Sequence, residues 1–375
     1  MHKVFAVMLI SLFVLSSFIG VFSSVLASET FEDSWHTKTP MNQARTNLGV
    51  VAVDGKIYAI GGSTVDDFAV DSTLGRYVGT NEQYDPKTDK WTTLASMPTP
   101  RAGFAITAYG DKIYCMGGDT YDSDAPVGEK YRHSNVVEVY DVATDSWSTK
   151  SFSSFVAGGQ AHVINEKIFV IVGNALHMYD PVTDVWTRKT DAPLYLFQLA
   201  SVVVDGKIIL TGNIIIEMKP TKLALKTIMY DPQTDVWSEG KTETELLSDT
   251  CVAGVTTRDY APQSVYFFSG ISNNLVYVPT TDTWTNAQAM PSHRLSFGMA
   301  VVDDVFYVIG GTLLGTDDKR EIVAMNEQYV PIGYSDVLPS DTKVPLITIG
   351  VVVGVVLSFG IVVGLFFYLN KRKER

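Results

Sequence analysis

Short apolar runs, separated by small polar and turn-forming residues, repeat along the chain between residues 33 and 333. A clear example is Lys56-Ile-Tyr-Ala-Ile60, which follows Asp54-Gly55 and precedes Gly61-Gly62. Short runs rich in β-branched and aromatic side chains are typical of strands, and Asp-Gly is typical of the tight turns between them. The pattern therefore predicts an all-β fold built of many short strands.

A second phrase repeats with the first and ends in tryptophan. Its clearest copy is Tyr84-Asp-Pro-Lys-Thr-Asp-Lys-Trp91, in which Asp-Pro and Thr-Asp are turn residues between two strands. One repeat then holds four short strands, a to d in chain order. Because a single four-stranded sheet cannot bury both of its faces, such repeats pack radially into a propeller. The tryptophans that count the repeats are Trp35, Trp91, Trp147, Trp186, Trp237 and Trp284, spaced 56, 56, 39, 51 and 47 residues apart.

The combination of a di-glycine, a Tyr-Asp-Pro turn and a tryptophan at this period resembles the kelch repeat. The resemblance covers residues 33–333 and implies a kelch β-propeller. The third, fourth and fifth repeats depart from the pattern, since each keeps a single glycine (Gly173, Gly212 and Gly270) in place of the pair. This departure concerns the turns of those repeats rather than the fold.

The first and last strand phrases predict how the ring closes. The sixth strand-c phrase, residues 326–331, has no tryptophan strand after it, whereas the tryptophan strand at residues 32–35 precedes every other strand. We expect the N-terminal strand to complete the last blade. The result is a six-bladed kelch propeller over residues 29–333 with no open sheet edge.

The two ends of the chain are predicted to lie outside the propeller. Residues 1–28 are apolar after Lys3 and end in small residues, which predicts a signal peptide or an uncleaved signal anchor. Residues 344–369 form an uncharged run that would reach roughly 39 Å as a helix, enough to cross the ~30 Å hydrocarbon core. A linker, residues 334–343, precedes this transmembrane helix, and a basic tail, residues 370–375, follows it. Because basic flanks stay in the cytoplasm, the sequence predicts a single-pass protein of the cell membrane with its propeller outside.

Three glycines of the predicted transmembrane helix fall on one side of it. Gly350, Gly354 and Gly364 lie within about 80° of one another at 100° per residue. A stripe of small residues lets two membrane helices approach closely. The sequence therefore predicts a homodimer formed through these glycines.

The charge of the chain limits its partners. Lys and Arg number 29 against 41 Asp and Glu, which gives a net charge of −12. So acidic a chain is a poor match for a nucleic-acid backbone, and we predict no nucleic-acid partner. Its two cysteines, Cys115 and Cys251, lie in apolar runs and are expected to be buried, which excludes a disulfide-stapled module.

The long loops of the predicted propeller fall on one face. In an antiparallel blade the b–c and d–a loops share one end, and both chain ends lie at the other, next to the linker. The b–c/d–a face should therefore point away from the membrane, and long loops on a rigid scaffold are where binding usually occurs. The longest b–c insertions are residues 63–80, 119–134 and 312–321, in the first, second and last blades.

The same three blades share an arginine at the start of strand a and a glutamate two residues before the tyrosine of strand c. One interpretation is a structural ion pair, since a half-buried arginine needs a partner. The other is a cationic sector at the channel mouth that binds an acidic ligand, a role that the kelch resemblance implies for strand-a arginines. The candidate ligand-binding residues are Arg45, Arg101 and Arg294, flanked by Tyr77, Tyr121 and Tyr131, and the glutamates are Glu82, Glu138 and Glu327.

Catalytic and metal-binding motifs are absent from the sequence. The six histidines lack metal-ligand spacing, and His162 and His177 are interpreted as structural residues of the third blade. We therefore predict no catalytic residues, no metal site and no cofactor. The main functional hypothesis is a cell-surface recognition module that offers the b–c/d–a face to an extracellular protein or carbohydrate. The alternative, resting on architecture alone, is an extracytoplasmic sugar-processing enzyme of the sialic-acid mutarotase type.

Overall fold

The computed structural model separates the chain into two compact units, one ending at Tyr334 and one beginning at Ser335. No helix in the described part of the chain is long and apolar enough to span a membrane. The segments predicted as signal peptide, transmembrane helix, glycine stripe and tail lie outside the described residues. The described residues are 32–65, 77–122, 124–126, 130–151, 159–194, 196–218, 221–243, 251–270, 274–315 and 319–335.

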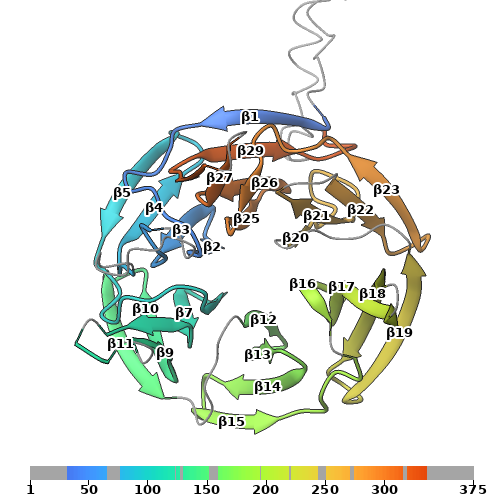
Figure 1. Cartoon of the computed structure of the whole chain (residues 1–375), viewed down its shortest axis with the longest axis horizontal. Helices are drawn as coiled ribbons and strands as arrows, with labels where there is room; N and C mark the ends of the chain where they lie inside the picture. The colour runs from blue at the N-terminus through green and yellow to red at the C-terminus, as the bar shows by residue number, and fades with distance from the viewer. Residues whose placement is uncertain are drawn as a thin grey trace, which may run out of the picture. The chain divides into compact units, whose positions relative to one another are not determined.

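The first unit is all-β, as the sequence predicts. Six of its sheets have four antiparallel strands each, and Figure 1 shows them standing around a common axis. We number these sheets in chain order from the one that contains β2. The innermost strands are β2 (Gly49–Val53), β6 (Ala105–Tyr109), β12 (Gln160–Ile164), β16 (Phe197–Val204), β20 (Cys251–Val255) and β25 (Gly298–Val302).

Each innermost strand is followed outward by three more. The second strands are β3 (Lys56–Ile60), β7 (Lys112–Met116), β13 (Lys167–Val172), β17 (Lys207–Met218), β21 (Val265–Ser269) and β26 (Val305–Ile309). The third strands are β4 (Asn81–Asp85), β10 (Val136–Asp141), β14 (Ala175–Asp180), β18 (Thr221–Asp231), β22 (Asn274–Val278) and β29 (Asn326–Val330). The outermost strands are β5 (Lys90–Leu94), β11 (Ser146–Ser151), β15 (Val185–Arg188), β19 (Val236–Glu243), β23 (Thr283–Ala287) and β1 (Ser34–Lys38).

The repeated tryptophan phrase both turns the chain within a sheet and joins neighbouring sheets. The Tyr84 hydroxyl donates to Asp89 Oδ1 (2.6 Å), which also accepts the backbone N–H of Thr39 (2.9 Å) from the end of β1. Trp91 Nε1 donates to the Thr39 carbonyl (2.8 Å), so two bonds hold the sixth sheet to the first. The same two bonds join Asp145 and Trp147 to Ala95, Asp235 and Trp237 to Thr190, and Asp33 and Trp35 to Gln288.

The apolar core lies between the sheets rather than in one central mass. Each of six buried clusters in the described residues combines side chains from two neighbouring sheets. Between the sixth and first sheets, for example, Tyr307 meets Ile57 and Tyr84. Cys115 belongs to one such cluster, and burial raises the pKa of its thiol to about 12, which leaves it unreactive. The side chain of Cys251 lies outside the described part.

The N-terminal strand completes the last sheet, as the two end phrases predict. β1 is the outermost strand of the sixth sheet and pairs antiparallel with β29, with Trp35 opposite Tyr329. Nearby, the backbone N–H of Gly333 donates to the Glu32 carboxylate (2.6 Å). The first and last described residues therefore lie side by side at one end of the ring. We call the other end, where second strands connect to third strands, the insertion end.

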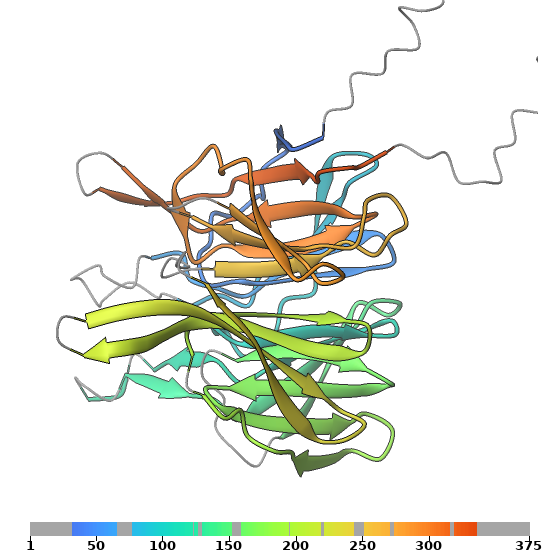
Figure 2. The ribbon, with the colours of Figure 1, turned by 90° about the vertical axis from the view of Figure 1, so that its right-hand side faces the viewer.

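The fourth sheet has an extension that the sequence analysis missed. β17 and β18 are 12 and 11 residues long, against five or six for their counterparts in the other sheets. They project at the insertion end together with the small sheets formed by β8 and β9 and by β27 and β28 (Figure 2). The apolar run at Ile214 and Ile215 continues the strand pattern, so the sequence gives no sign of an insertion there.

Candidate functional site

The predicted insertions of the second and sixth sheets are short β-hairpins at the insertion end. In the second sheet, β8 (Asp119–Tyr121) pairs with β9 (Tyr131–His133). In the sixth, β27 (Thr312–Leu314) lies between β24 (Arg294–Leu295) and β28 (Arg320–Ile322). In the first sheet, Ser63 bridges to both Thr46 and Tyr77. Side chains on these elements are therefore held by backbone pairing.

The three predicted arginines are buried against the three predicted glutamates. Arg45 Nη2 lies 2.7 Å from Glu82 Oε2, and Arg294 Nη2 lies 2.5 Å from Glu327 Oε2. Arg101 makes the same ion pair with Glu138. All three arginine side chains are 0% exposed. Burial lowers the pKa of Arg45, and the carboxylate of Glu82 opposes that shift.

Each ion pair organises a piece of backbone. Arg45 donates to the carbonyls of Gly61 (2.8 Å), Thr80 (3.0 Å) and Ala59 (3.1 Å), and Glu82 accepts the backbone N–H of Asn42 (2.9 Å). The pair thus ties β3, β4 and the loop that leads into β2 to one point. This geometry supports the ion-pair interpretation of the arginines. The guanidinium groups present no exposed surface to an acidic ligand.

Two of the arginines contact di-glycines through their backbone. Gly62 N donates to the Arg101 carbonyl (3.0 Å), and Gly311 N donates to the Arg45 carbonyl (2.8 Å), so the arginine backbone of one sheet binds the glycine pair of the preceding sheet. A Cβ on Gly61 would lie 2.8 Å from the Arg101 carbonyl oxygen, which a side chain cannot accept. Arginine, glutamate and di-glycine are therefore one structural unit.

The three predicted tyrosines come together as an aromatic cluster. Tyr131 lies 5.2 Å from Tyr121 and 6.3 Å from Tyr77 between ring centroids, so the cluster joins the first and second sheets at the insertion end. Tyr131 is 45% exposed. Lys130 Nζ lies 5.8 Å from the Tyr121 ring centroid. We call Tyr77, Tyr121 and Tyr131 the tyrosine cluster.

Charged side chains surround the tyrosine cluster in paired form. His133 Nδ1 lies 2.6 Å from Asp119 Oδ1 across the β8–β9 hairpin, and Arg132 lies 3.9 Å from Asp122. Within the described residues no group of three or more His, Cys, Asp or Glu side chains is arranged to hold a metal ion. Residues 66–76 of the insertion in the first blade lie outside the described residues. The absence of a metal site stays a prediction.

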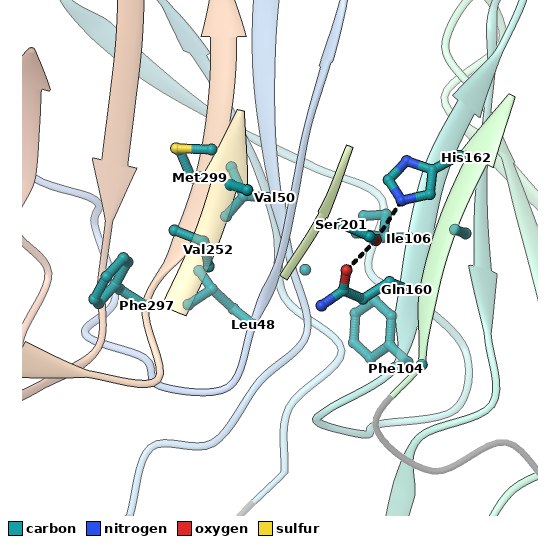
Figure 3. A pocket seen from close by; sticks show the side chains of 15 residues that line it. Leu48, Val50, Phe104, Ile106, Gln160, His162, Ser201, Val252, Phe297 and Met299 are labelled. Atoms are coloured by element: carbon teal, nitrogen blue, oxygen red, sulfur yellow. Dashed lines mark hydrogen bonds between the residues drawn. The ribbon is translucent and has the colours of Figure 1, made fainter. Parts of the chain in front are cut away.

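An axial cavity of about 260 Å³ is lined by all six innermost strands or the residues that lead into them. Its polar side chains come from two adjacent sheets and are Gln160, His162 and Ser201 (Figure 3). His162 Nε2 lies 2.5 Å from Ser201 Oγ, and Ser201 donates to Gln160 Oε1. The sequence analysis missed Gln160 and Ser201 and assigned His162 to the interior alone. Their signal, polar residues in innermost strands that are otherwise apolar, is visible only once strand a is located.

The pKa of His162 predicts how stability depends on pH. Burial lowers this pKa to about 4 in the folded chain, against about 6.5 when unfolded. The unfolded state therefore binds the proton first, and stability falls as the pH drops from about 6.5 to about 4. We expect His162→Gln to reduce that fall in thermal unfolding midpoint. The aspartates with lowered pKa, such as Asp180 at about 2, act only at more acid pH.

The control for this prediction is His177. Burial also lowers its pKa, so part of the fall between pH 6.5 and 4 should remain in His162→Gln and disappear in the double variant with His177→Gln. A pH profile of His162→Gln that overlays the unsubstituted chain would contradict the burial of a neutral His162.

The fold and the site define a β-propeller of the kelch class. The Kelch motif family model matches residues 44–98 and 100–151, which are the first two repeats. A solved structure, that of YjhT, superposes with a TM-score of 0.58 over 77% of this chain and 95% of that chain, at 16% identity, which is a likeness of fold. The chain belongs to the kelch-repeat proteins.

Curated relatives agree with this assignment. An F-box/kelch-repeat protein of Arabidopsis thaliana is 27% identical over 245 residues, which are 62% of this chain and 58% of that protein. Kelch-like protein 15 of Homo sapiens is 29% identical over 125 residues, 33% of this chain and 19% of that protein. The chain thus spans less than two thirds of these relatives. Kelch-repeat proteins generally mediate protein–protein binding.

Proposed function

We propose that the chain is a recognition module at the cell surface, whose six-bladed ring offers its insertion end to an extracellular protein. The observation that carries the proposal is the tyrosine cluster, with Tyr131 45% exposed on a hairpin. Tyrosine supplies large, rigid contact area and one hydroxyl, and it is enriched where binding energy concentrates. In the same two sheets the buried arginines bind the backbone carbonyls at the ends of the strands that carry these elements.

The orientation in the membrane is part of the same proposal. The first and last described residues lie together at the end opposite the insertion end. An anchor following residue 343 would therefore leave the insertion end directed outward. The sequence patterns of residues 1–28 and 344–369 support a cleaved or anchoring signal and a single membrane span, with homodimerisation through Gly350, Gly354 and Gly364 as a further consequence.

A binding module fits the geometry better than the sugar-processing alternative. Interconverting the anomers of a sugar requires placed acids and bases. Among the residues that the structure describes, the side chains that line the axial cavity include no carboxylate and no lysine or arginine, and their single titratable group is His162. A carbohydrate at the tyrosine cluster remains compatible with the module and is an outcome of the test below.

One experiment on intact cells tests orientation and partner together. Arg132→Cys, at a side chain 59% exposed next to Tyr131, is made in a Cys251→Ser background, and a membrane-impermeant maleimide that carries a photo-crosslinker is added. The matched control is Val182→Cys, because Val182 is 76% exposed in the turn between β14 and β15 at the opposite end. We expect labelling of both variants and a recurring crosslinked protein from position 132 alone.

The two ways of failing are distinguishable. If neither cysteine is labelled until the cells are permeabilised, the propeller is not outside the cell. If both are labelled but crosslink to the same proteins, or to none, the tyrosine cluster is not the recognition site. A crosslink to glycan in place of protein would show that the partner is a carbohydrate and not a protein.

A further inference from the structure

The axial cavity is divided into a polar and an apolar part. Gln160 and His162 on β12 and Ser201 on β16 lie on one side, and Figure 3 shows Val252, Phe297 and Met299 across from them. At the corresponding places between other sheets the lining is apolar, as with Val50, Phe104 and Ile106. Packing between β12 and β16 alone would not need polar groups here, because the other innermost strands line the cavity with apolar side chains.

The hydrogen bonds among Gln160, His162 and Ser201 determine which of their atoms can bind a ligand. Ser201 has one hydroxyl proton and donates it to Gln160 Oε1. His162 Nε2, 2.5 Å from Ser201 Oγ, must therefore carry the proton of that bond. In the neutral ring this leaves Nδ1 as a hydrogen-bond acceptor. The ring stays neutral at physiological pH because burial holds its pKa near 4.

The lining also limits the charge and size of an occupant. None of the described side chains that line the cavity is formally charged, so among them an ion would lose its hydration without gaining a counter-charge. A volume of about 260 Å³ lies just below the usual range of ligand pockets, roughly 300–1,000 Å³, and suits a single substituted ring. Phe104 and Phe297 also line the cavity, where they are 6% and 5% exposed.

We propose that the axial cavity is a binding site for an uncharged, ring-containing small molecule that carries an amide-like edge. The amide-like edge donates a hydrogen bond to His162 Nδ1, while the ring packs against the partly exposed apolar lining residues Ile106, Val252 and Met299. The lining residues Leu48, Phe104 and Phe297 precede their strands, so the cavity lies in the half of the channel next to the insertion end. The proposal rests on the cavity alone and not on a partner at the tyrosine cluster.

The test uses three isosteric probes: benzamide, benzoate and benzamidine. Binding to the purified full chain is measured by ligand-observed NMR at pH 7.5. We expect benzamide to bind and the anion and the cation to bind at least about tenfold more weakly, because each must shed hydration in an uncharged cavity. His162→Phe, which removes the acceptor, should weaken benzamide about tenfold, the effect of about 1.4 kcal/mol for one hydrogen bond.

Further variants keep the proposal falsifiable. Ser201→Ala removes the hydroxyl that orients both neighbours and should also weaken benzamide, whereas Tyr131→Ala at the surface should not. Thermal unfolding shows whether each variant is folded. No benzamide binding, equal binding of benzoate, or benzamide binding that survives both His162→Phe and Ser201→Ala would each overturn the proposal.

Discussion

Replacing Arg101 with alanine is expected to lower the free energy of unfolding by about 3–5 kcal/mol, measured by denaturant titration of the purified chain. The substitution leaves Glu138 charged, 1% exposed and without its counter-charge. It also frees the Cys115 and Thr99 carbonyls, which accept from Arg101 at 2.9 and 3.2 Å. Breaking a buried ion pair costs more than the pair itself contributes, because the remaining ion stays buried.

A double substitution separates the effect of an unpaired buried charge on stability from the effect of lost packing. Arg101→Met with Glu138→Leu removes both ions and fills similar volume, so it should recover most of the stability lost in Arg101→Ala. Lys112→Ala is the surface control, since its ion pair with Asp141 is partly exposed, at 39% and 26%, and should contribute far less. If Arg101→Ala and Lys112→Ala cost the same, the buried pairs are not the structural units that we describe.

The strands and their order could be predicted because the kelch phrase is local. Tyr84, Asp89 and Trp91 lie within eight positions of one another and carry the turn, the hydrogen bond and the ring contact of one sheet. Such a unit repeats with little dependence on the rest of the chain. The co-occurrence of arginine and glutamate was also visible, and the buried ion pair was one of its two interpretations.

The axial cavity could not be predicted in the same way. Gln160 and Ser201 are 41 positions apart on different sheets, and their contact depends on how closely those sheets approach. A lone histidine in an apolar strand gives no sign of whether its second nitrogen faces a core or a cavity. The long hairpin of β17 and β18 escaped notice for the opposite reason, because its apolar alternation resembles an ordinary strand.

The tyrosine cluster could be predicted from the sequence in part. Tyr77, Tyr121 and Tyr131 were chosen as flanking residues of an arginine site, and the structure brings them into contact with one another. Loop length and blade adjacency indicated the region, since neighbouring insertions at one end must meet. The arginines themselves lie beneath this surface, because an unsolvated guanidinium is more stable beside a buried carboxylate. Proximity was therefore predictable, whereas exposure was not.

Removing the closing strand is expected to have the largest effect of any local change. Trp35 packs against Phe268 and Tyr329, at 5.4 and 5.0 Å between ring centroids, and Asp33 accepts from the Tyr329 hydroxyl (2.7 Å). Trp35→Ala alone should cost about 3–5 kcal/mol, or a fall of roughly 6–10 °C in unfolding midpoint.

Deletion of residues 32–38 should cost more than Trp35→Ala, because it also exposes the edge of β29 and breaks the bonds that hold the sixth sheet to the fifth. A synthetic peptide of residues 31–40 added to the deleted chain should pair with β29 and raise the midpoint again in a concentration-dependent way. The same peptide with Trp35→Ala is the matched control and should restore little. Trp91→Ala is a second control. It removes the same kind of contact between two sheets that the chain connects directly, so the ring stays closed. A deleted chain as stable as the intact one, or rescued equally by both peptides, would show that the ring does not depend on this strand for closure.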